Sequence, residues 1–159
     1  MRPVPQLALL LTTFIWAATF PATKLALEQV LPFPFLFLRF LLGTLAVGIV
    51  FVCLRQPLRC DAPTLRMAAI ASAFLFVGYV TQTVGLRYTT ASNSAFITAL
   101  YVVLVPLFLK RFDARLWTAL ALAVAGLWLL IRPSADMKVG DLYTLAAAVA
   151  FALHIIVVE

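Results

Sequence analysis

Hydroxyl-bearing and aromatic side chains recur at helical spacing in one apolar stretch near the start of the sequence. This stretch carries Thr12, Trp16, Thr19 and Thr23 at positions i, i+4, i+7 and i+11. Because these offsets place side chains one above another on a helix, the four residues share one face. Such a face either makes hydrogen bonds to a neighbouring helix or lines a wet cavity, and the spacing leaves both interpretations open.

Two later apolar stretches repeat this pattern. One carries Ser94, Thr98 and Tyr101, and the other carries Ser72, Tyr79 and Thr83, with Gln82 one step round the helix. Three polar and aromatic faces in one small protein converge more than helix packing alone requires. Pro106 follows the first of these two faces, and we expect a bend there because proline removes a helical hydrogen bond.

Arg39 and His154, two side chains that can carry a positive charge, lie well inside apolar stretches. Arg39 is six residues inside Phe33, roughly 9 Å deep at 1.5 Å per residue. An arginine in a membrane span by default marks a functional site, although its guanidinium can also reach the headgroups. No Asp or Glu lies within a stretch, so its partner must be a backbone carbonyl, a lipid phosphate or an anionic substrate group. His154, the single histidine, serves either proton coupling or a hydrogen bond to a neighbouring helix.

Apolar stretches fill almost the whole chain. They are Leu7–Thr23, Phe33–Leu54, Leu65–Leu86, Ala91–Leu109, Leu116–Ile131 and Leu142–Val158. Each is about as long as the ~20 residues that a transmembrane helix needs. Of the 159 residues 65% are hydrophobic and only 11% are charged, against about 25% charged in soluble domains. The sequence therefore predicts an all-α, polytopic transmembrane helix bundle of about six spans in the lipid bilayer.

The basic residues gather on one side of that bundle if successive helices alternate in direction. Arg2, Arg55, Arg59, Arg66, Lys110, Arg111 and Arg115 lie on the side of the N-terminus. Lys24, Arg87, Arg132 and Lys138 lie on the other side, where Glu28, Asp136 and Asp141 offset them. This bias predicts a cytoplasmic N-terminus in a cell inner membrane. The net charge of +6 is therefore a topology signal and does not indicate nucleic-acid binding.

Three polar residues lie near the outer ends of their stretches. They are Lys24, Gln82 and Asn93. They either form a polar vestibule or anchor the helices at the membrane interface.

Motifs for covalent chemistry are absent from the sequence. It has no HExxH, GxSxG or P-loop motif, no Cys/His spacing typical of a metal site and no pair of carboxylates within the stretches. We therefore expect neither an intramembrane hydrolase nor an ATP-driven pump, and no cofactor or metal.

A weak internal repeat appears when the sequence is shifted by 135 positions. The shift places Trp16 on Phe151 and Lys24 on Glu159. A repeat unit of five helices would make the next copy start from the opposite side of the membrane, as in many secondary transporters. The sequence stops at the first charge after the sixth stretch, so we expect a truncated chain.

The order of several short motifs resembles the EamA-like branch of the drug/metabolite transporter superfamily. They are Phe14-Ile15-Trp16-Ala17-Ala18-Thr19-Phe20-Pro21-Ala22-Thr23-Lys24, Leu38-Arg39-Phe40, Gly85-Leu86-Arg87-Tyr88-Thr89-Thr90-Ala91-Ser92-Asn93-Ser94-Ala95, Thr98-Ala99-Leu100-Tyr101 and Ala125-Gly126-Leu127-Trp128-Leu129-Leu130. The chain departs from the family where a glycine-glutamate pair often follows the fourth helix, since Lys110-Arg111-Phe112-Asp113-Ala114 stands there.

The resemblance implies two inverted five-helix repeats, of which residues 5–132 form the first and residues 140–159 open a second, truncated one. It also implies a transporter, resembling exporters of small metabolites or drugs, with substrate bound near the midplane. We expect Trp16, Tyr79 and Tyr101 to form an aromatic lining there. Thr19, Gln82 and Thr98 would offer hydrogen bonds, while Arg39 and Lys24 would steer or anchor charge at the outer mouth.

Two alternatives remain open. One is a compact transporter that acts as a dimer of short chains, although small multidrug resistance proteins have four spans and a buried glutamate that this chain lacks. The other is a non-transporting membrane subunit or scaffold, in which the polar faces are buried between helices.

Overall fold

The computed structural model describes residues 3–55, 61–132 and 136–159, and within them every regular element is an α-helix. The helices are α1 Pro3–Gln29, α2 Pro32–Cys53, α3 Ala62–Tyr88, α4 Ala91–Ala99, α5 Tyr101–Phe108, α6 Ala114–Ile131 and α7 Val139–Val158. The predicted all-α bundle is therefore confirmed. Arg2 and Arg59, which the charge pattern used, lie outside the described residues.

Among the described residues, five spans are long and apolar enough to cross a membrane. They are α1, α2, α3, α4 together with α5, and α7. The remaining predicted span, Leu116–Ile131, lies in α6, a shorter apolar helix. Its 18 residues extend about 27 Å, just under the ~30 Å of a typical hydrocarbon core.

The ends of the helices follow from local side-chain chemistry. Prolines occupy the first turns of α2 and α3, where a missing N–H costs nothing. The Thr90 hydroxyl accepts the N–H of Asn93 at 3.0 Å and starts α4. Asp113 starts α6 in the same way, because its carboxylate accepts the N–H of Leu116 at 2.9 Å.

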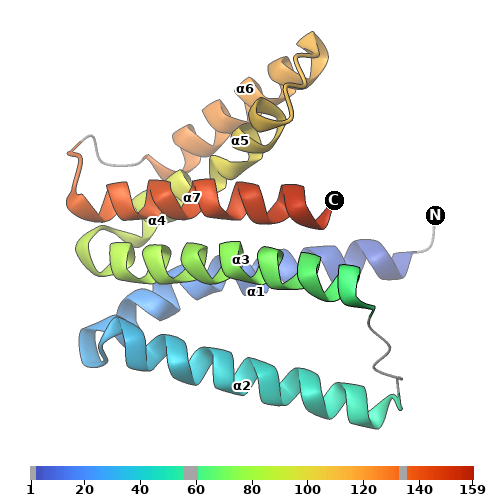
Figure 1. Ribbon diagram of the computed structural model, residues 1–159. Coiled ribbons are helices and arrows are strands. Elements are labelled where there is room, and N and C mark those ends of the chain that lie inside the picture. Colours follow the sequence, from blue (N-terminus) through green and yellow to red (C-terminus); the bar gives the residue numbers. More distant parts are fainter. Residues whose placement is uncertain (1–2, 56–60, 133–135) are drawn as a thin grey trace.

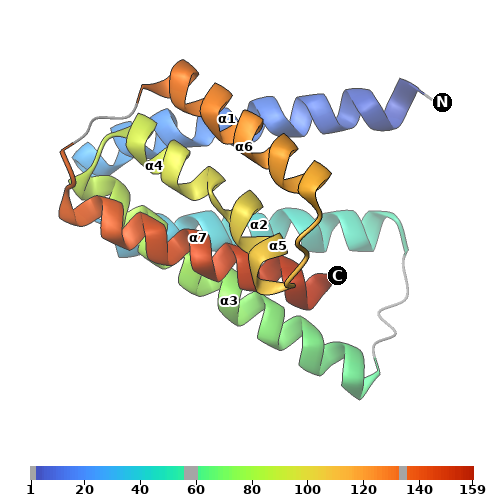
Figure 2. The same ribbon diagram turned by 90° about the horizontal axis from the view of Figure 1, so that it is seen from above.

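The fourth predicted span is divided at Leu100, not at Pro106. The Leu100 N–H bonds to the Ile97 carbonyl, three residues back, and ends α4. Pro106 lies buried inside α5, six residues further on. The expected bend therefore exists but is displaced toward the N-terminus, and the chain changes direction there in both views (Figures 1 and 2).

Successive spans run in opposite directions along the bundle (Figure 1). The α1–α2 and α3–α4 turns lie at one end, which we call the Lys24 end, and both chain termini lie toward the other. Helices α1, α2 and α3 lie close together at the Lys24 end and diverge toward the other end (Figures 1 and 2). Residues 6–18 of α1 and 41–53 of α2, in the diverging halves, are all exposed. The best-packed part of these helices is thus the Lys24 end.

Helix α7 packs most extensively against α3, and the two lie side by side (Figure 1). Glycines permit this contact, because a Cβ added to Gly85 would lie 2.7 Å from the Gly140 carbonyl oxygen. One added to Gly78 would lie 2.5 Å from the Phe151 ring. Small residues let membrane helices approach closely where no hydrophobic effect drives them together. This packing fixes which side chains of α3 face the remaining helices.

Candidate functional site

The ammonium group of Lys24 caps the C-terminal end of α3. Its Nζ donates to the carbonyl oxygens of Leu86 at 2.7 Å, Arg87 at 3.2 Å and Thr89 at 2.7 Å. The last carbonyls of a helix have no partner within it, and the helix dipole makes that end attractive to a cation. Lys24 therefore joins the end of α1 to the end of α3.

Asp141 joins the start of α7 to the same place. The Thr89 hydroxyl donates to Oδ1 at 2.5 Å, and the Lys138 N–H donates to Oδ2 at 2.8 Å. Both Asp141 and Thr89 are buried. The sequence had indicated Asp141 only as one of the acids that offset the basic residues on this side. Its spacing of three from Lys138 is typical of a carboxylate in the first turn of a helix, and this was the available signal.

Two further hydroxyl groups complete the polar contacts at this end. The Ser94 and Thr144 hydroxyls lie 3.4 Å apart, and Thr144 also donates to the Gly140 carbonyl at 2.9 Å. Five residues from α1, α4, α7 and the α3–α4 turn therefore form one group, which we call the Lys24 cluster. Its members are Lys24, Thr89, Ser94, Asp141 and Thr144.

Asn93, the other predicted vestibule residue, is buried beside Ser94 on α4. Lys24 is half-buried. The structure thus brings both residues to the Lys24 end, while their predicted role in a vestibule stays a prediction.

Toward the middle of the bundle, the predicted site residues meet in pairs across helices. Gln82 Nε2 on α3 donates to Thr98 Oγ1 on α4 at 3.0 Å. The rings of Trp16 on α1 and Tyr101 on α5 have centroids 6.5 Å apart, within the usual range for aromatic pairs.

Arg39 on α2 makes the third such pair. Its guanidinium carbon lies 4.5 Å from the centroid of the Tyr79 ring on α3. This distance is typical of a cation–π contact, and such a contact stabilises a positive charge that lies away from bulk water.

Helical neighbours connect these three pairs. Tyr79 precedes Gln82 by three residues on α3, and Thr98 precedes Tyr101 by three residues across the α4–α5 break. Thr19 is linked to both Trp16 and Arg39, because its hydroxyl donates to the Trp16 carbonyl at 2.6 Å and it lines one pocket with Arg39. These contacts, the helical spacing and the shared pocket place all seven residues predicted to bind substrate in one group, which we call the site ring. Its members are Trp16, Thr19, Arg39, Tyr79, Gln82, Thr98 and Tyr101.

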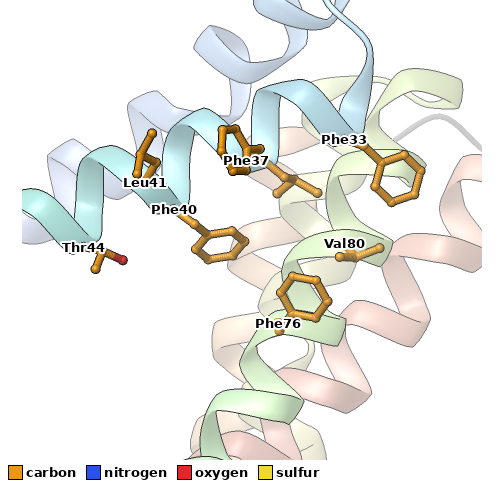
Figure 3. Close-up of a pocket in the computed structure, with 8 residues that line it drawn as sticks. Phe33, Phe37, Phe40, Leu41, Thr44, Phe76 and Val80 are labelled. Carbon is orange, nitrogen blue, oxygen red and sulfur yellow. The ribbon is translucent and has the colours of Figure 1, made fainter.

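Two pockets flank α2 beside the site ring. The first, of about 410 Å³, lies between α1 and α2 and contains Thr19, Thr23 and Arg39 among apolar side chains. The second, of about 430 Å³, lies between α2 and α3 and is almost wholly apolar. Figure 3 shows Phe40 and Phe76 at this second pocket, with their centroids 5.9 Å apart. The volumes of these two pockets are within the range of small-molecule sites.

Aromatic residues that the pattern did not single out surround Tyr79. Phe40 on α2 and Phe151 on α7 both meet its ring edge-to-face, with centroids 5.6 Å and 5.5 Å away. The internal repeat aligns Phe151 with Trp16, and this alignment was the feature of the sequence that could have indicated Phe151 as a neighbour of the site. The site ring therefore has contact with α7 as well.

His154 lies apart from the site ring, at the interface of α7 and α3. Its Nδ1 lies 2.8 Å from the Ala71 carbonyl oxygen. A carbonyl can only accept, so this nitrogen carries the proton. The arrangement matches a hydrogen bond to a neighbouring helix, and a role in proton coupling stays a prediction.

The groups of the site ring are suited to recognition of a small molecule. The site ring presents aromatic faces, one guanidinium, one amide and hydroxyl groups, most of them half-buried. Such groups bind and orient a small molecule through stacking, charge and hydrogen bonds.

Known proteins similar to this chain are transporters by name. A model of the EamA-like transporter family matches residues 5–132. A protein of Archaeoglobus fulgidus named "Uncharacterized transporter" is 36% identical over 163 residues, which cover 99% of this chain and 50% of that protein. Another of the same name and organism is 30% identical over 135 residues, covering 82% of this chain and 47% of that protein. No solved structure matches the chain.

The chain spans about half the length of the curated relatives it matches. The family model nevertheless covers most of its residues, and the order of its motifs and its apolar helices agree with that match. This multi-pass membrane protein belongs to the EamA-like transporter family.

Proposed function

We propose that this chain contributes to a secondary transporter that exports small metabolites or drugs, with substrate bound at the site ring. The observation that carries the proposal is that seven residues chosen from the sequence lie on four separate spans and make three contacts between those spans. Binding residues in a helix bundle lie on facing helices near the middle of the membrane. Half-buried aromatic and polar groups in that place are suited to a substrate that enters from water.

Alternating access would follow from the difference between the two ends of the bundle. The Lys24 cluster holds α1, α3, α4 and α7 together at one end, while α1, α2 and α3 diverge toward the other. If the N-terminus lies in the cytoplasm, the diverging end of the bundle faces the cytoplasm and the Lys24 end faces the outside. The structure is then a form that is closed to the outside. Export then requires the Lys24 cluster to separate while the diverging halves approach one another.

The orientation has its own test. Reporter tags at the Arg87 turn and at the Lys110 turn are expected to report opposite compartments, with the Lys110 turn in the cytoplasm of the cell.

A second set of helices would complete the site. In this proposal residues 5–132 form one five-helix repeat, and residues 140–159 open a second one that is inverted. Support comes from Phe151, which the repeat aligns with Trp16 and which contacts Tyr79 on the site ring. Trp16 itself is 47% exposed, so one side of the ring is free to meet further helices. These helices would come from a longer form of this chain or from a second copy in a homodimer.

Water access to the site ring distinguishes a transporter from a membrane scaffold. Single cysteines at Thr19, Gln82 and Thr98 are each to be treated with a membrane-impermeant maleimide from either side of the membrane. We expect labelling at Thr19 and Gln82, which are half-buried, and weaker labelling at the buried Thr98. A cysteine at Ala152, which is wholly buried on α7 outside the Lys24 cluster, is the matched control and should not react. Failure of all three site cysteines to react would favour the scaffold.

A further inference from the structure

The charge of Arg39 has no carboxylate partner in the part of the chain that the structure describes. The ion pair found there joins Arg111 to Glu159 at 3.5 Å, on other helices. The nearest strong contact of Arg39 is the Tyr79 ring, 4.5 Å from its guanidinium carbon. A positive charge inside a membrane span is costly unless something compensates it. The ring compensates only part of this cost, since a cation–π contact contributes about 0.5–2 kcal/mol.

The position of Tyr79 shows that the guanidinium is held inside the span. Tyr79 lies nine residues before Tyr88, the last residue of α3, which is about 14 Å along the helix. An arginine that extends to the headgroups would instead direct its charge to the end of the bundle. Arg39 therefore points into the protein, where an approaching anion is only weakly screened by water.

Stacking leaves the hydrogen-bonding edge of the guanidinium available. The group is planar, and its N–H donors lie in the plane, so a ring against one face covers none of them. Contact with the ring also restricts the side chain before a ligand arrives. A planar group held in this way suits a carboxylate or phosphate, which accepts two parallel hydrogen bonds.

The pocket beside Arg39 indicates what kind of molecule bears the anionic group. Its volume is about 410 Å³, and its walls are mainly the apolar side chains of α1 and α2, such as Phe35, Leu38 and Leu42. Thr19 and Thr23 also line it, but almost all of the lining surface is apolar. A ligand that fits both the Arg39 charge and these apolar walls has an apolar body and a single anionic group.

We propose that Arg39 binds the carboxylate or phosphate of a small molecule whose apolar body fills the pocket between α1 and α2. The proposal rests on the proposed function in that this anionic molecule is the one transported. The same chemistry is present in the phosphate of a lipid headgroup, so the two sources require separate experiments.

The first experiment compares three probes with one apolar body and different charge. They are 3-phenylpropionate, 3-phenylpropanol and 3-phenylpropylamine, titrated into the purified protein in nanodiscs of neutral phosphatidylcholine. We expect the acid to bind at least about tenfold more tightly than the alcohol, as a charge-assisted hydrogen bond predicts, and the amine to bind most weakly.

Variants then assign this preference to Arg39. In Arg39→Gln the acid should bind no better than the alcohol, while Arg39→Lys should keep part of the preference. Arg87→Gln, which removes an exposed arginine outside the pocket, is the matched control and should keep all of it. Thermal unfolding of each variant identifies any that fail to fold, and Arg39→Lys keeps the test decisive if Arg39→Gln is one of them.

The second experiment compares membranes of a neutral, phosphate-free glycolipid with membranes in which anionic phosphatidylglycerol replaces part of it, because phosphatidylcholine itself carries a phosphate. If a lipid phosphate occupies the site, phosphatidylglycerol should weaken binding of the acid in the wild-type protein and leave Arg39→Gln unchanged. If a solute occupies it, binding of the acid should be the same in both membranes.

Two results would overturn the inference: equal binding of acid and alcohol by the wild-type protein, or an acid preference that survives in Arg39→Gln. The inference is also overturned if neither the acid nor the anionic lipid shows binding that depends on Arg39. Transport is measured separately in vesicles. Arg39-dependent binding without transport contradicts the proposed function alone, and transport without a preference for the acid contradicts this inference alone.

Discussion

Lys24 near the end of α1 donates a hydrogen bond from its ammonium group to the carbonyl oxygen of Leu86 at the end of α3, at 2.7 Å. The same nitrogen also reaches the carbonyls of Arg87 and Thr89. One charged group thus satisfies three carbonyls that the helix itself leaves unpaired. The lysine that closes the family-like motif of the first span is a cap for another helix in this structure, and this gives it a testable role in stability.

Replacing Lys24 by methionine should destabilise the protein by about 1.5–3 kcal/mol, the usual contribution of hydrogen bonds from a charged group. The apolar part of the side chain is retained, so packing changes little. Thermal unfolding in detergent measures the effect. Lys110→Met, at an exposed position at the other end of the bundle, is the control and should unfold near the wild-type temperature. Equal unfolding of Lys24→Met and the wild type would contradict the capping role.

Replacing Asp141 by asparagine should also destabilise the Lys24 end, by about 1–3 kcal/mol. The side chain keeps its size and one oxygen, but its amide NH₂ would face either the Thr89 hydroxyl or the Lys138 N–H, both of which donate to it now. Denaturation by increasing amounts of SDS measures the loss. Asp136→Asn, at an exposed position, should have no effect. An Asp141→Asn protein as stable as the wild type would show that these two bonds are dispensable.

Replacing Gly85 by alanine should separate α3 from α7. The new methyl group would lie 2.7 Å from the Gly140 carbonyl oxygen and 2.8 Å from Tyr143 Cβ, too close for real contacts. Overpacking of this kind costs about 1–3 kcal/mol. Gly43→Ala is the matched control, because nothing lies within 4 Å of its added methyl group. If both variants unfold at the same temperature, the close approach of the two helices is wrong.

Replacing His154 by asparagine tests whether this histidine takes part in proton coupling. The amide nitrogen of asparagine occupies nearly the same place as Nδ1, so it can still donate to the Ala71 carbonyl, but it does not titrate. The geometry favours a structural bond, so the variant should keep both the rate of transport and its dependence on pH. A flattened pH profile in vesicles would instead assign His154 a role in proton coupling.

The sequence predicted the spans and the polar faces because both follow from local periodicity. Trp16, Tyr79, Thr98 and Tyr101 were found from spacings of three and four, and all of them lie in the site ring. The length of each apolar stretch predicted the helices in the same way. The exceptions are the break at Leu100, which lies away from the proline expected to cause it, and the shortness of α6.

The partners across helices were beyond prediction from periodicity. Lys24 bonds to backbone carbonyls, which every residue carries, so no side-chain pattern marks Leu86 or Thr89 as its partners. Asp141 was counted only among the acids that offset the basic residues of the outer side. Its burial against Thr89 depends on how closely α7 approaches α3, and therefore on Gly85 and Gly140. Such contacts between distant segments emerge only from the packed structure.

The central claim, that substrate binds at the site ring, is tested most directly by transport in inverted membrane vesicles. The probes are labelled phenylalanine, labelled 3-phenylpropionate and ethidium, and the variants are Trp16→Ala, Tyr101→Ala and the matched control Trp128→Ala, which removes an exposed indole from α6. For whichever probe the wild type carries, losing either aromatic ring should slow transport at least about tenfold, as expected for an aromatic contact of 1.5 kcal/mol or more, while Trp128→Ala keeps the wild-type rate. Unchanged transport in correctly inserted Trp16→Ala and Tyr101→Ala proteins would contradict the account.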